Sequence, residues 1–395
     1  MEERVMNFNK IVKGGVAAFM AMSMVACSSS SSSSSDTFKL GGSGPLSGDA
    51  AVYGTAVQRG AEIAIKEINK EGKIKFEFNF QDDQADGEKA VTAFNTLADW
   101  GMQVSLATTT SGAGQATSSL YQEEDIFAIT PSGSSPAVIY QDSENEKDAY
   151  GNVFQMCFSD PNQGVASADY ISEHSDVGTK VGIIYRNDDS YSSGIYKKFK
   201  AEAEKLGLEI VTEQTFLNGN TDYSVQVSAC KEAGADVIFL PIYYQPASQI
   251  LAEANKQGYD VNFFGCDGMD GILTMEGFDT SLAEGLYMLT PFSADAEDEK
   301  TQSFVKAYEK KYGETPIQFA ADAYDAVYAI AQALEESGVS PSDSTSDITA
   351  ALKKEFTSMT FDGLTGTSVT WNKNGEVSKA PKAVVIQDGA YVGVE

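Results

Sequence analysis

The feature that most constrains the fold is a strand–helix alternation that runs through this chain twice. From Phe38 onward, short apolar runs alternate with segments in which apolar residues recur every three or four positions. The residues from Ile74 to Phe80 alternate strictly between apolar and polar, which is typical of a strand, and 51–70 has the helical spacing. This repetition predicts an α/β protein with parallel sheets covered by helices on both faces.

The alternation stops across a polar, irregular stretch, Thr130–Pro161, and then starts again, which predicts two similar doubly wound lobes. The first unit is predicted to have strands at 38–42, 74–80, 104–107 and 126–129 and helices at 51–70, 86–100 and 115–124. The second is predicted to have strands at 180–185, 209–216, 237–241, 262–265 and 285–290 and helices at 191–206, 223–233 and 246–257. After Pro291 we expect two long helices, at 298–312 and 318–336, and then a strand-rich tail from Gly366.

Length and charge narrow the class of protein further. A chain of 395 residues, 42% of them apolar, suits two α/β lobes better than one ordinary domain. Asp and Glu total 57 against 28 Lys and Arg, for a net charge of −29. So acidic a surface repels phosphate backbones and anionic headgroups, which argues against nucleic-acid binding.

The N-terminus is typical of an export signal. Lys10 and Lys13 precede an apolar run, 14–26, that is shorter than the ~20 residues needed to span a bilayer and suits a signal peptide. The run ends at Met24-Val-Ala-Cys27, which resembles a bacterial lipobox, and serines occupy 28–35. We therefore expect a signal peptide at 1–26, with Met1 or Met6 as the start, and at 27–36 a lipidated Cys27 with a flexible tether. This places the mature protein on the extracytoplasmic face of the cell membrane, at the cell surface or in the periplasm.

The usual catalytic and cofactor motifs are missing from the sequence. Its one histidine, His174, sits in a polar stretch and is predicted to lie on the surface, which removes Ser-His and Cys-His nucleophile schemes. Gly42 to Gly48 reads GxGxxxG rather than the dinucleotide fingerprint, and no GxxxxGK[ST] loop is present. We therefore expect no enzyme activity, no cofactor and no metal.

Cysteine spacing gives no further motif. No pair among Cys27, Cys157, Cys230 and Cys266 has CxxC spacing, so neither a zinc knuckle nor a redox motif is present. Cys157, Cys230 and Cys266 leave at least one thiol unpaired, and whether the other two form a disulfide stays open.

Polar groups of opposite character follow the predicted strands of the two units. Thr108-Thr-Thr-Ser-Gly112 and Pro131-Ser-Gly-Ser-Ser-Pro136 follow consecutive strands of the first unit and offer hydroxyls and backbone N–H groups to an anion. Asp267 follows a strand of the second unit and suits an ammonium group. Parallel sheets bind ligands at the carboxyl ends of their strands, so the sequence predicts a receptor for a zwitterion between the lobes.

These residues resemble a known family, the branched-chain amino-acid-binding proteins (leucine/isoleucine/valine type) of ABC importers, which have the type I periplasmic-binding fold. The resemblance covers Phe38 to Glu395. It is most specific in three stretches: Gly44-Pro-Leu-Ser-Gly…Val-Tyr53-Gly54, Ile129-Thr-Pro-Ser-Gly-Ser-Ser-Pro136 and Ala323-Tyr-Asp-Ala-Val-Tyr328. It implies an amino-acid ligand, branched-chain or similarly small, a permease partner and a monomeric protein.

The resemblance also implies residue roles. The carboxylate would be bound by Ser111, the backbone at Ser132 and the hydroxyl of Ser134, and the ammonium by Asp267, where the family usually has Glu. Aromatic contacts fall on Tyr53, Tyr191 and Tyr243. The resemblance does not imply the side-chain specificity, but Thr110 lies next to Ser111 and is expected to face the ligand's side chain. The ligand-binding positions expected are therefore Ser111, Ser132, Ser134, Tyr53, Tyr191, Tyr243, Asp267 and Thr110.

The resemblance further implies a hinge with three crossings, at 154–158, 289–291 and 361–367. Lobe 1 would comprise 37–155 plus 291–364, and lobe 2 would comprise 156–290 plus 365–395. The alternative left open is a receptor of the same fold for an amide, a peptide or an aromatic acid, which in one version feeds a membrane sensor.

Overall fold

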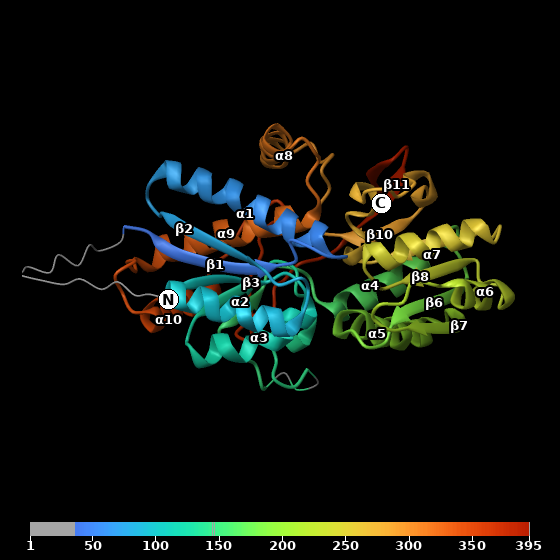
Figure 1. The fold of residues 1–395 in the computed structure, drawn as a ribbon, viewed down its shortest axis with the longest axis horizontal. Helices are drawn as coiled ribbons and strands as arrows, with labels where there is room; N and C mark the ends of the chain where they lie inside the picture. Colours follow the sequence, from blue (N-terminus) through green and yellow to red (C-terminus); the bar gives the residue numbers. More distant parts are fainter. Residues whose placement is uncertain (1–35, 144, 146, 395) are drawn as a thin grey trace, which may run out of the picture. The chain divides into compact units, whose positions relative to one another are not determined.

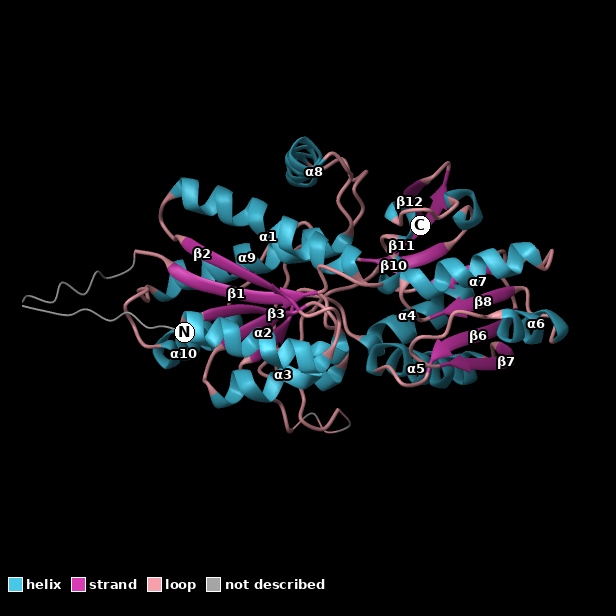
Figure 2. Ribbon diagram, in the orientation of Figure 1, coloured by secondary structure: helices cyan, strands magenta, loops and turns pink. Residues whose placement is uncertain are grey.

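The chain forms two separate β-sheets covered by helices in a computed structural model that describes residues 36–143, 145 and 147–394 (Figures 1 and 2). The predicted signal peptide and Cys27 lie outside these residues, as does the tether apart from Asp36. Among the described residues, no helix is long and apolar enough to cross a membrane.

The first sheet is entirely parallel, in the strand order β2-β1-β3-β4-β5. Its strands are β1 (Phe38–Gly44), β2 (Phe76–Asp82), β3 (Val104–Thr108), β4 (Phe127–Thr130) and β5 (Val153–Gln155). The helices between them are α1 (Ala51–Glu71), α2 (Gly87–Trp100) and α3 (Ser111–Glu123), with a short 3-10 turn, η1 (Pro136–Val138). The prediction of a parallel α/β sheet is confirmed here.

The second sheet has the order β12-β11-β10-β9-β8-β6-β7 and is parallel except at β11 and β12. Its strands are β6 (Lys180–Arg186), β7 (Glu209–Phe216), β8 (Val237–Leu240), β9 (Asn262–Gly265), β10 (Tyr287–Thr290), β11 (Lys382–Gln387) and β12 (Ala390–Val394). Its helices are α4 (Asp160–Glu173), α5 (Ser190–Leu206), α6 (Ser224–Glu232) and α7 (Tyr244–Lys256). Three 3-10 turns follow β9: η2 (Asp267–Met269), η3 (Ile272–Thr274) and η4 (Thr280–Ala283).

Both faces of each sheet are buried. In β8, Val237 and Phe239 belong to one apolar cluster and Ile238 and Leu240 to another, so alternate side chains enter different cores. The first sheet divides in the same way, and Figure 1 shows α1 and α9 (Gln318–Ser337) on one of its faces and α2 and α3 on the other. The near-continuous apolar strands of the sequence reflect this double burial.

Three helices follow β10: α8 (Glu299–Tyr312), α9 (Gln318–Ser337) and α10 (Thr345–Phe356). Although these helices come between β10 and β11 of the second sheet in sequence, α9 packs against α1, where a Cβ on Gly60 would lie 2.0 Å from the Ala320 carbonyl oxygen. Helix α10 lies against β4, whose Phe127 N–H donates to Thr349 Oγ1 at 2.9 Å. The chain therefore passes between the sheets three times: after β5, after β10 and after α10.

Several predicted elements differ from the structure. Helices α4 and α10 and strand β5 were not predicted, because α4 is rich in small and polar residues and β5 has only three residues. The tail from Gly366 holds only two regular strands, β11 and β12. His174 is half-buried rather than on the open surface, and its ring stacks on Tyr170 at 4.0 Å between centroids.

The open question about cysteine pairing has an answer for the described part of the chain. Cys157, Cys230 and Cys266 are all free and buried. Burial raises the pKa of the Cys230 thiol to about 12, so these side chains behave as small core residues.

Candidate functional site

The first wall of the site begins where β3 leaves the first sheet. The register between β1 and β3 shifts there, and Ala107 adopts φ = 49°, an uncommon value for a residue other than glycine. The Ala107 N–H donates to Ser105 Oγ at 2.8 Å, which holds this irregular turn. Such a bulge redirects a strand end, and here it is followed directly by Thr108, Thr109 and Thr110.

Helix α3 starts at Ser111, four residues earlier than predicted, with Thr110 as its N-cap. The Thr110 hydroxyl makes no capping hydrogen bond, so the N–H groups of the first turn receive no side-chain partner from it. The N-terminus of a helix attracts anions through these N–H groups and its dipole. The residues 110–113 therefore offer a place for a carboxylate.

The loop after β4 lies directly beside this helix end. The Ser135 N–H donates to Ser111 Oγ at 3.2 Å, which leaves the Ser111 hydroxyl hydrogen available for a ligand. Thr130 Oγ1 donates to the Thr108 carbonyl at 2.7 Å and accepts from the Gly133 N–H at 2.7 Å. Ser134 is completely buried, and its hydroxyl has no hydrogen-bond partner.

The opposite wall carries Asp267, in η2 directly after β9 of the second sheet. Its Oδ1 accepts a hydrogen bond from Tyr191 Oη at 2.7 Å, and the same Tyr191 oxygen accepts from the Gly268 N–H at 2.9 Å. The Asp267 N–H donates to Gln163 Oε1 at 3.2 Å. Burial raises the pKa of Asp267 to about 7, although the hydrogen bonds from Tyr191 and Gly268 partly oppose this.

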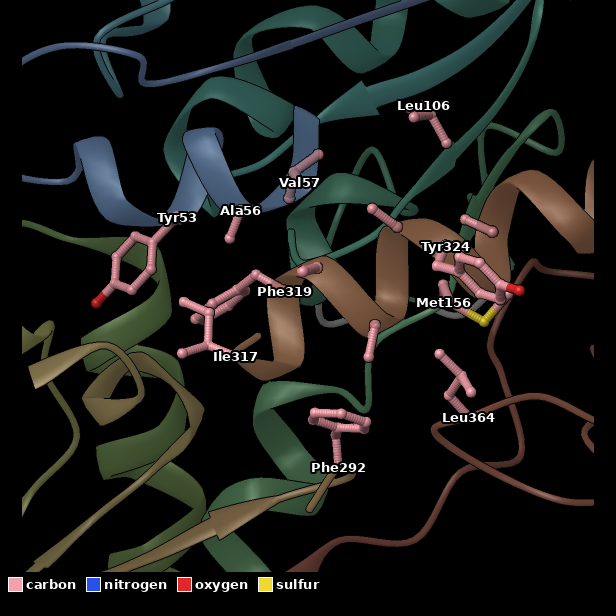
Figure 3. Packing of buried hydrophobic residues seen from close by; sticks show 14 of the residues in the cluster. Tyr53, Ala56, Val57, Leu106, Met156, Phe292, Ile317, Phe319, Tyr324 and Leu364 are labelled. Atoms are coloured by element: carbon pink, nitrogen blue, oxygen red, sulfur yellow. The ribbon is translucent and has the colours of Figure 1, made fainter. Parts of the chain in front are cut away.

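Aromatic side chains close the site around these polar groups. Tyr53, in α1, donates to the Gly268 carbonyl and accepts from the Tyr244 N–H at 3.1 Å. Its ring lies edge-on to Tyr243, 5.3 Å between centroids. It also lies 4.6 Å from the ring of Phe319 at the start of α9, and Figure 3 shows Tyr53 and Phe319 from close by. Tyr53 therefore connects a helix of the first sheet to the loops of the second.

The glycine next to Tyr53 explains one of the sequence stretches that carry the family resemblance. A Cβ on Gly54 would lie 2.2 Å from the Pro45 carbonyl oxygen. Helix α1 can thus approach the turn after β1 only with glycine at this position, and this approach sets the position of Tyr53.

These groups surround one cavity with an empty volume of about 240 Å³. Its lining residues are Tyr53, Thr109, Thr110, Ser111, Ser132, Tyr191, Tyr243, Asp267, Gly268 and Phe319. Seven of the eight predicted ligand-binding residues lie on this cavity, and Ser134 is buried just outside its lining. The sequence reasoning missed Thr109, Gly268 and Phe319; Phe319 gave no local signal, because α9 is brought to the site only by the chain's return to the first sheet.

The cavity has two chemically different ends. Ser111, Ser132 and the start of α3 present hydrogen-bond donors, whereas Asp267 presents a carboxylate. No Lys, Arg or His is among its lining residues. Within the described part of the chain, no cluster of His, Cys, Asp and Glu could hold a metal ion. The arrangement can therefore hold a small molecule that is anionic at one end and cationic at the other.

Comparison with known proteins agrees with this geometry. Residues 37–390 match the family model described as periplasmic binding protein. The leucine-, isoleucine-, valine-, threonine- and alanine-binding protein of Pseudomonas aeruginosa is 26% identical over 326 residues, 82% of each chain. The Leu/Ile/Val/Thr-binding protein of Salmonella typhimurium is 26% identical over 356 residues, 89% of this chain and 92% of its own.

Solved structures show the same fold. The branched-chain amino-acid transporter substrate-binding protein of Streptococcus pneumoniae, solved with isoleucine, is 28% identical, with a TM-score of 0.79 over 91% of this chain and 100% of its own. A solute-binding protein of Rhodopseudomonas palustris, solved with 3,4-dihydroxybenzoic acid, is 19% identical, with a TM-score of 0.77 over 91% and 96% of the two chains. The likeness to the Rhodopseudomonas protein, at 19% identity, shows the fold alone. The family model matches nearly all of the described residues, so this chain belongs to the periplasmic binding protein family, solute-binding proteins of the type I fold.

Proposed function

We propose that this protein is the extracytoplasmic solute-binding lipoprotein of an ABC importer and that it captures a single α-amino acid. The observation that carries the proposal is the pair of chemically opposed groups that line one cavity. Ser111, Ser132 and the first turn of α3 suit an α-carboxylate, and Asp267 suits an α-ammonium group. Charge-assisted hydrogen bonds contribute ~1.5–3 kcal/mol each, so a few of them suffice for micromolar binding after association costs.

The lining of the cavity supports a small side chain. The lining combines aromatic rings with the Thr109 and Thr110 side chains, and Thr110 Oγ1 is buried without a hydrogen-bond partner. This mixture suits small aliphatic or hydroxyl-bearing amino acids, the range that the names of the Pseudomonas and Salmonella relatives cover.

In this function the ligand stabilises a closed arrangement that a permease then recognises. Ligand shifts such an equilibrium only if it contacts both sides of the site, and the cavity is lined from both sheets. The proposal includes the predicted lobe boundaries, a monomeric protein and attachment to the membrane through a lipid on Cys27. It also includes capture without turnover.

An aromatic acid is the second candidate ligand, because a protein of the same fold was solved with 3,4-dihydroxybenzoic acid. Such a ligand has no cation for Asp267. In this chain it would leave a buried carboxylate facing a second anion, which is costly. The acidic end of the cavity therefore favours an amino acid.

A ligand panel tests the proposal directly. We expect one or more of L-leucine, L-isoleucine, L-valine, L-threonine and L-alanine to raise the melting temperature, because only a ligand of the folded state does so. Native mass spectrometry of the purified protein should show a co-purified amino acid, with no product after incubation. Stabilisation by benzoate or 3,4-dihydroxybenzoate alone would favour the second candidate.

Two variants sharpen this test. Asp267→Ala should weaken binding of the stabilising amino acid more than tenfold, on the order of 1.4 kcal/mol or more, by isothermal titration calorimetry. The exposed Asp260→Ala serves as its control and should bind as the parent does. Cys27→Ser should release the protein from the membrane fraction of producing cells without changing its affinity.

A further inference from the structure

The start of helix α9 is hydrogen-bonded to the loop that carries Asp267. Gln318, the first residue of α9, is completely buried, and its Nε2 donates to the Asp267 carbonyl oxygen at 3.0 Å. Its backbone N–H donates to Asp270 Oδ2 at 2.8 Å. Asp267 and Asp270 follow β9 of the second sheet, whereas α9 packs on α1 beside the first sheet. Gln318 therefore joins the two sides of the site through two hydrogen bonds.

These bonds take the place of a cap that α9 lacks. Its N-cap residue is Ile317, whose side chain has no acceptor, and its first turn contains no acidic residue. The N–H groups at a buried helix start need partners, and a carboxylate there also interacts favourably with the helix dipole. Asp270 supplies that carboxylate from a position 48 residues away in sequence. The N–H of Gln318 thus has its partner on the opposite side of the site.

The loop 267–271 also contacts α1, the second helix on this side. Tyr53 donates to the Gly268 carbonyl oxygen, and Figure 3 shows Tyr53 near Ile317 and Phe319 at the start of α9. Gly271 adopts φ = 102°, and a Cβ on it would lie 2.8 Å from Val52 Cγ1 of α1. Only glycine permits so close an approach in this conformation. The loop therefore contacts α1 and α9 directly beside the carboxylate that lines the cavity.

Contacts of this kind affect binding without touching a ligand. Gln318 and Asp270 are outside the cavity lining, so neither is placed to recognise the bound molecule itself. A contact that forms only when the two sides of a site meet stabilises the closed arrangement. Because the Gln318 bonds are made to the Asp267 loop, their loss would free the acid that holds the ligand's ammonium group in the proposed function.

We propose that Gln318 and Asp270 are positioning residues, which hold the loop 267–270 closed over the ligand and so slow the ligand's release. This inference rests on the proposed function and deepens it, because it assigns part of the closing contact to residues that do not bind the amino acid. The two hydrogen bonds form only after the ligand has entered an open site. They should therefore affect the dissociation rate constant koff and leave the association rate constant kon unchanged.

Stopped-flow fluorescence tests this separation of rates. The probes are L-leucine, L-isoleucine, L-valine, L-threonine and L-alanine, and the proteins are the parent, Asp270→Ala, Gln318→Ala and Asp270→Asn. Asp270→Ala and Gln318→Ala should raise koff about fivefold or more and change kon less than about twofold, because each loses a buried hydrogen bond of the closed form. Asp270→Asn keeps an oxygen that accepts from the Gln318 N–H, so its koff should stay within about threefold of the parent value.

The matched control breaks similar hydrogen bonds away from the site. Asp236 accepts from the backbone N–H groups of Thr179 and Lys180 at 2.8 and 2.7 Å, all within the second sheet's side of the molecule. Asp236→Ala should leave kon and koff unchanged even if it lowers the melting temperature. A merely structural role for Asp270 would give the same result as this control.

The remaining outcomes separate this inference from the proposed function. If the parent binds an amino acid and both alanine variants keep its koff, or change kon as much as koff, only this inference falls. If the parent binds none of the five amino acids, the proposed function falls with it. If neither alanine variant folds, crystal structures of the parent with and without its amino acid decide, since both Gln318 hydrogen bonds kept in the ligand-free form would refute a closing contact.

Discussion

Two regions of this protein bury acidic side chains, and they do so in opposite ways. In the site, Asp267 accepts a hydrogen bond from Tyr191 but has no cationic partner among the described residues. Near the third passage between the sheets, Asp322 and Asp325 of α9 are also completely buried, but Lys379 Nζ lies 2.7 Å from Asp322 Oδ1. Asp325 accepts from the Leu364 and Thr365 N–H groups at 2.8 and 2.9 Å.

The difference separates acids that the chain neutralises itself from an acid that, in the proposed function, a ligand neutralises. The α9 cluster supplies its own cation and donors, so it fastens residues 364–379 to α9 whether or not a ligand is present. Asp267 has a hydrogen-bond donor in Tyr191 but no cation among the described residues, and in the proposed function the ligand's ammonium group supplies that cation. A folded protein that keeps such a carboxylate gives up stability for binding, as functional sites commonly do.

The largest expected effect is a loss of stability when the buried Lys379–Asp322 ion pair is broken. Lys379→Met should lower the free energy of unfolding by ~3–5 kcal/mol at pH 7.5, because it leaves a buried carboxylate uncompensated. Urea denaturation measures this loss. Lys382→Met, an exposed lysine three residues later, is the control and should cost less than ~0.5 kcal/mol. A loss below ~1 kcal/mol for Lys379→Met would show that the two regions do not differ as described.

An intermediate effect follows from pH. Burial raises the pKa of Asp267 to about 7 and the pKa of Asp83, Asp270 and Asp322 to about 6. For an acid with a raised folded-state pKa, the native state keeps its proton while the unfolded state has lost it. Stability is therefore greatest below the unfolded value near 4 and falls as pH rises through the folded values.

We expect the ligand-free protein to lose ~2 kcal/mol or more of unfolding free energy between pH 5 and 8. A saturating amino acid should flatten this fall, since its ammonium group holds the Asp267 carboxylate ionised at no added cost. Chemical denaturation at several pH values, with and without ligand, measures both curves. Parallel curves would mean that the ligand does not compensate Asp267.

The smallest expected effect is a gain in stability, opposite in sign to the loss expected for Lys379→Met. Asp267→Asn should raise the stability of the ligand-free protein at pH 8 by ~1 kcal/mol, because it removes a buried charge without a cationic partner. The same variant should lose affinity for the amino acid. A clear loss of stability would show instead that the hydrogen bond from Tyr191 makes Asp267 a structural acid like Asp325.

The sequence by itself determined the architecture and most of the site. Apolar periodicity predicted the helices and the parallel strands, because double burial leaves a local pattern in every strand. The loops after β3 and β4 and Asp267 after β9 were predictable since parallel strands direct their carboxyl ends to one edge. The Gly44–Gly54 stretch needed the family resemblance for its role, and the structure adds the contact between Gly54 and Pro45 that explains it.

Only the tertiary structure decided the remaining partners. Phe319 reaches the site because α9 returns to the first sheet, and Lys379 meets Asp322 across 57 residues. The local sequence pattern indicates whether a residue is buried and in which element it lies. Which distant residues contact it depends on how the helices and sheets pack together in three dimensions.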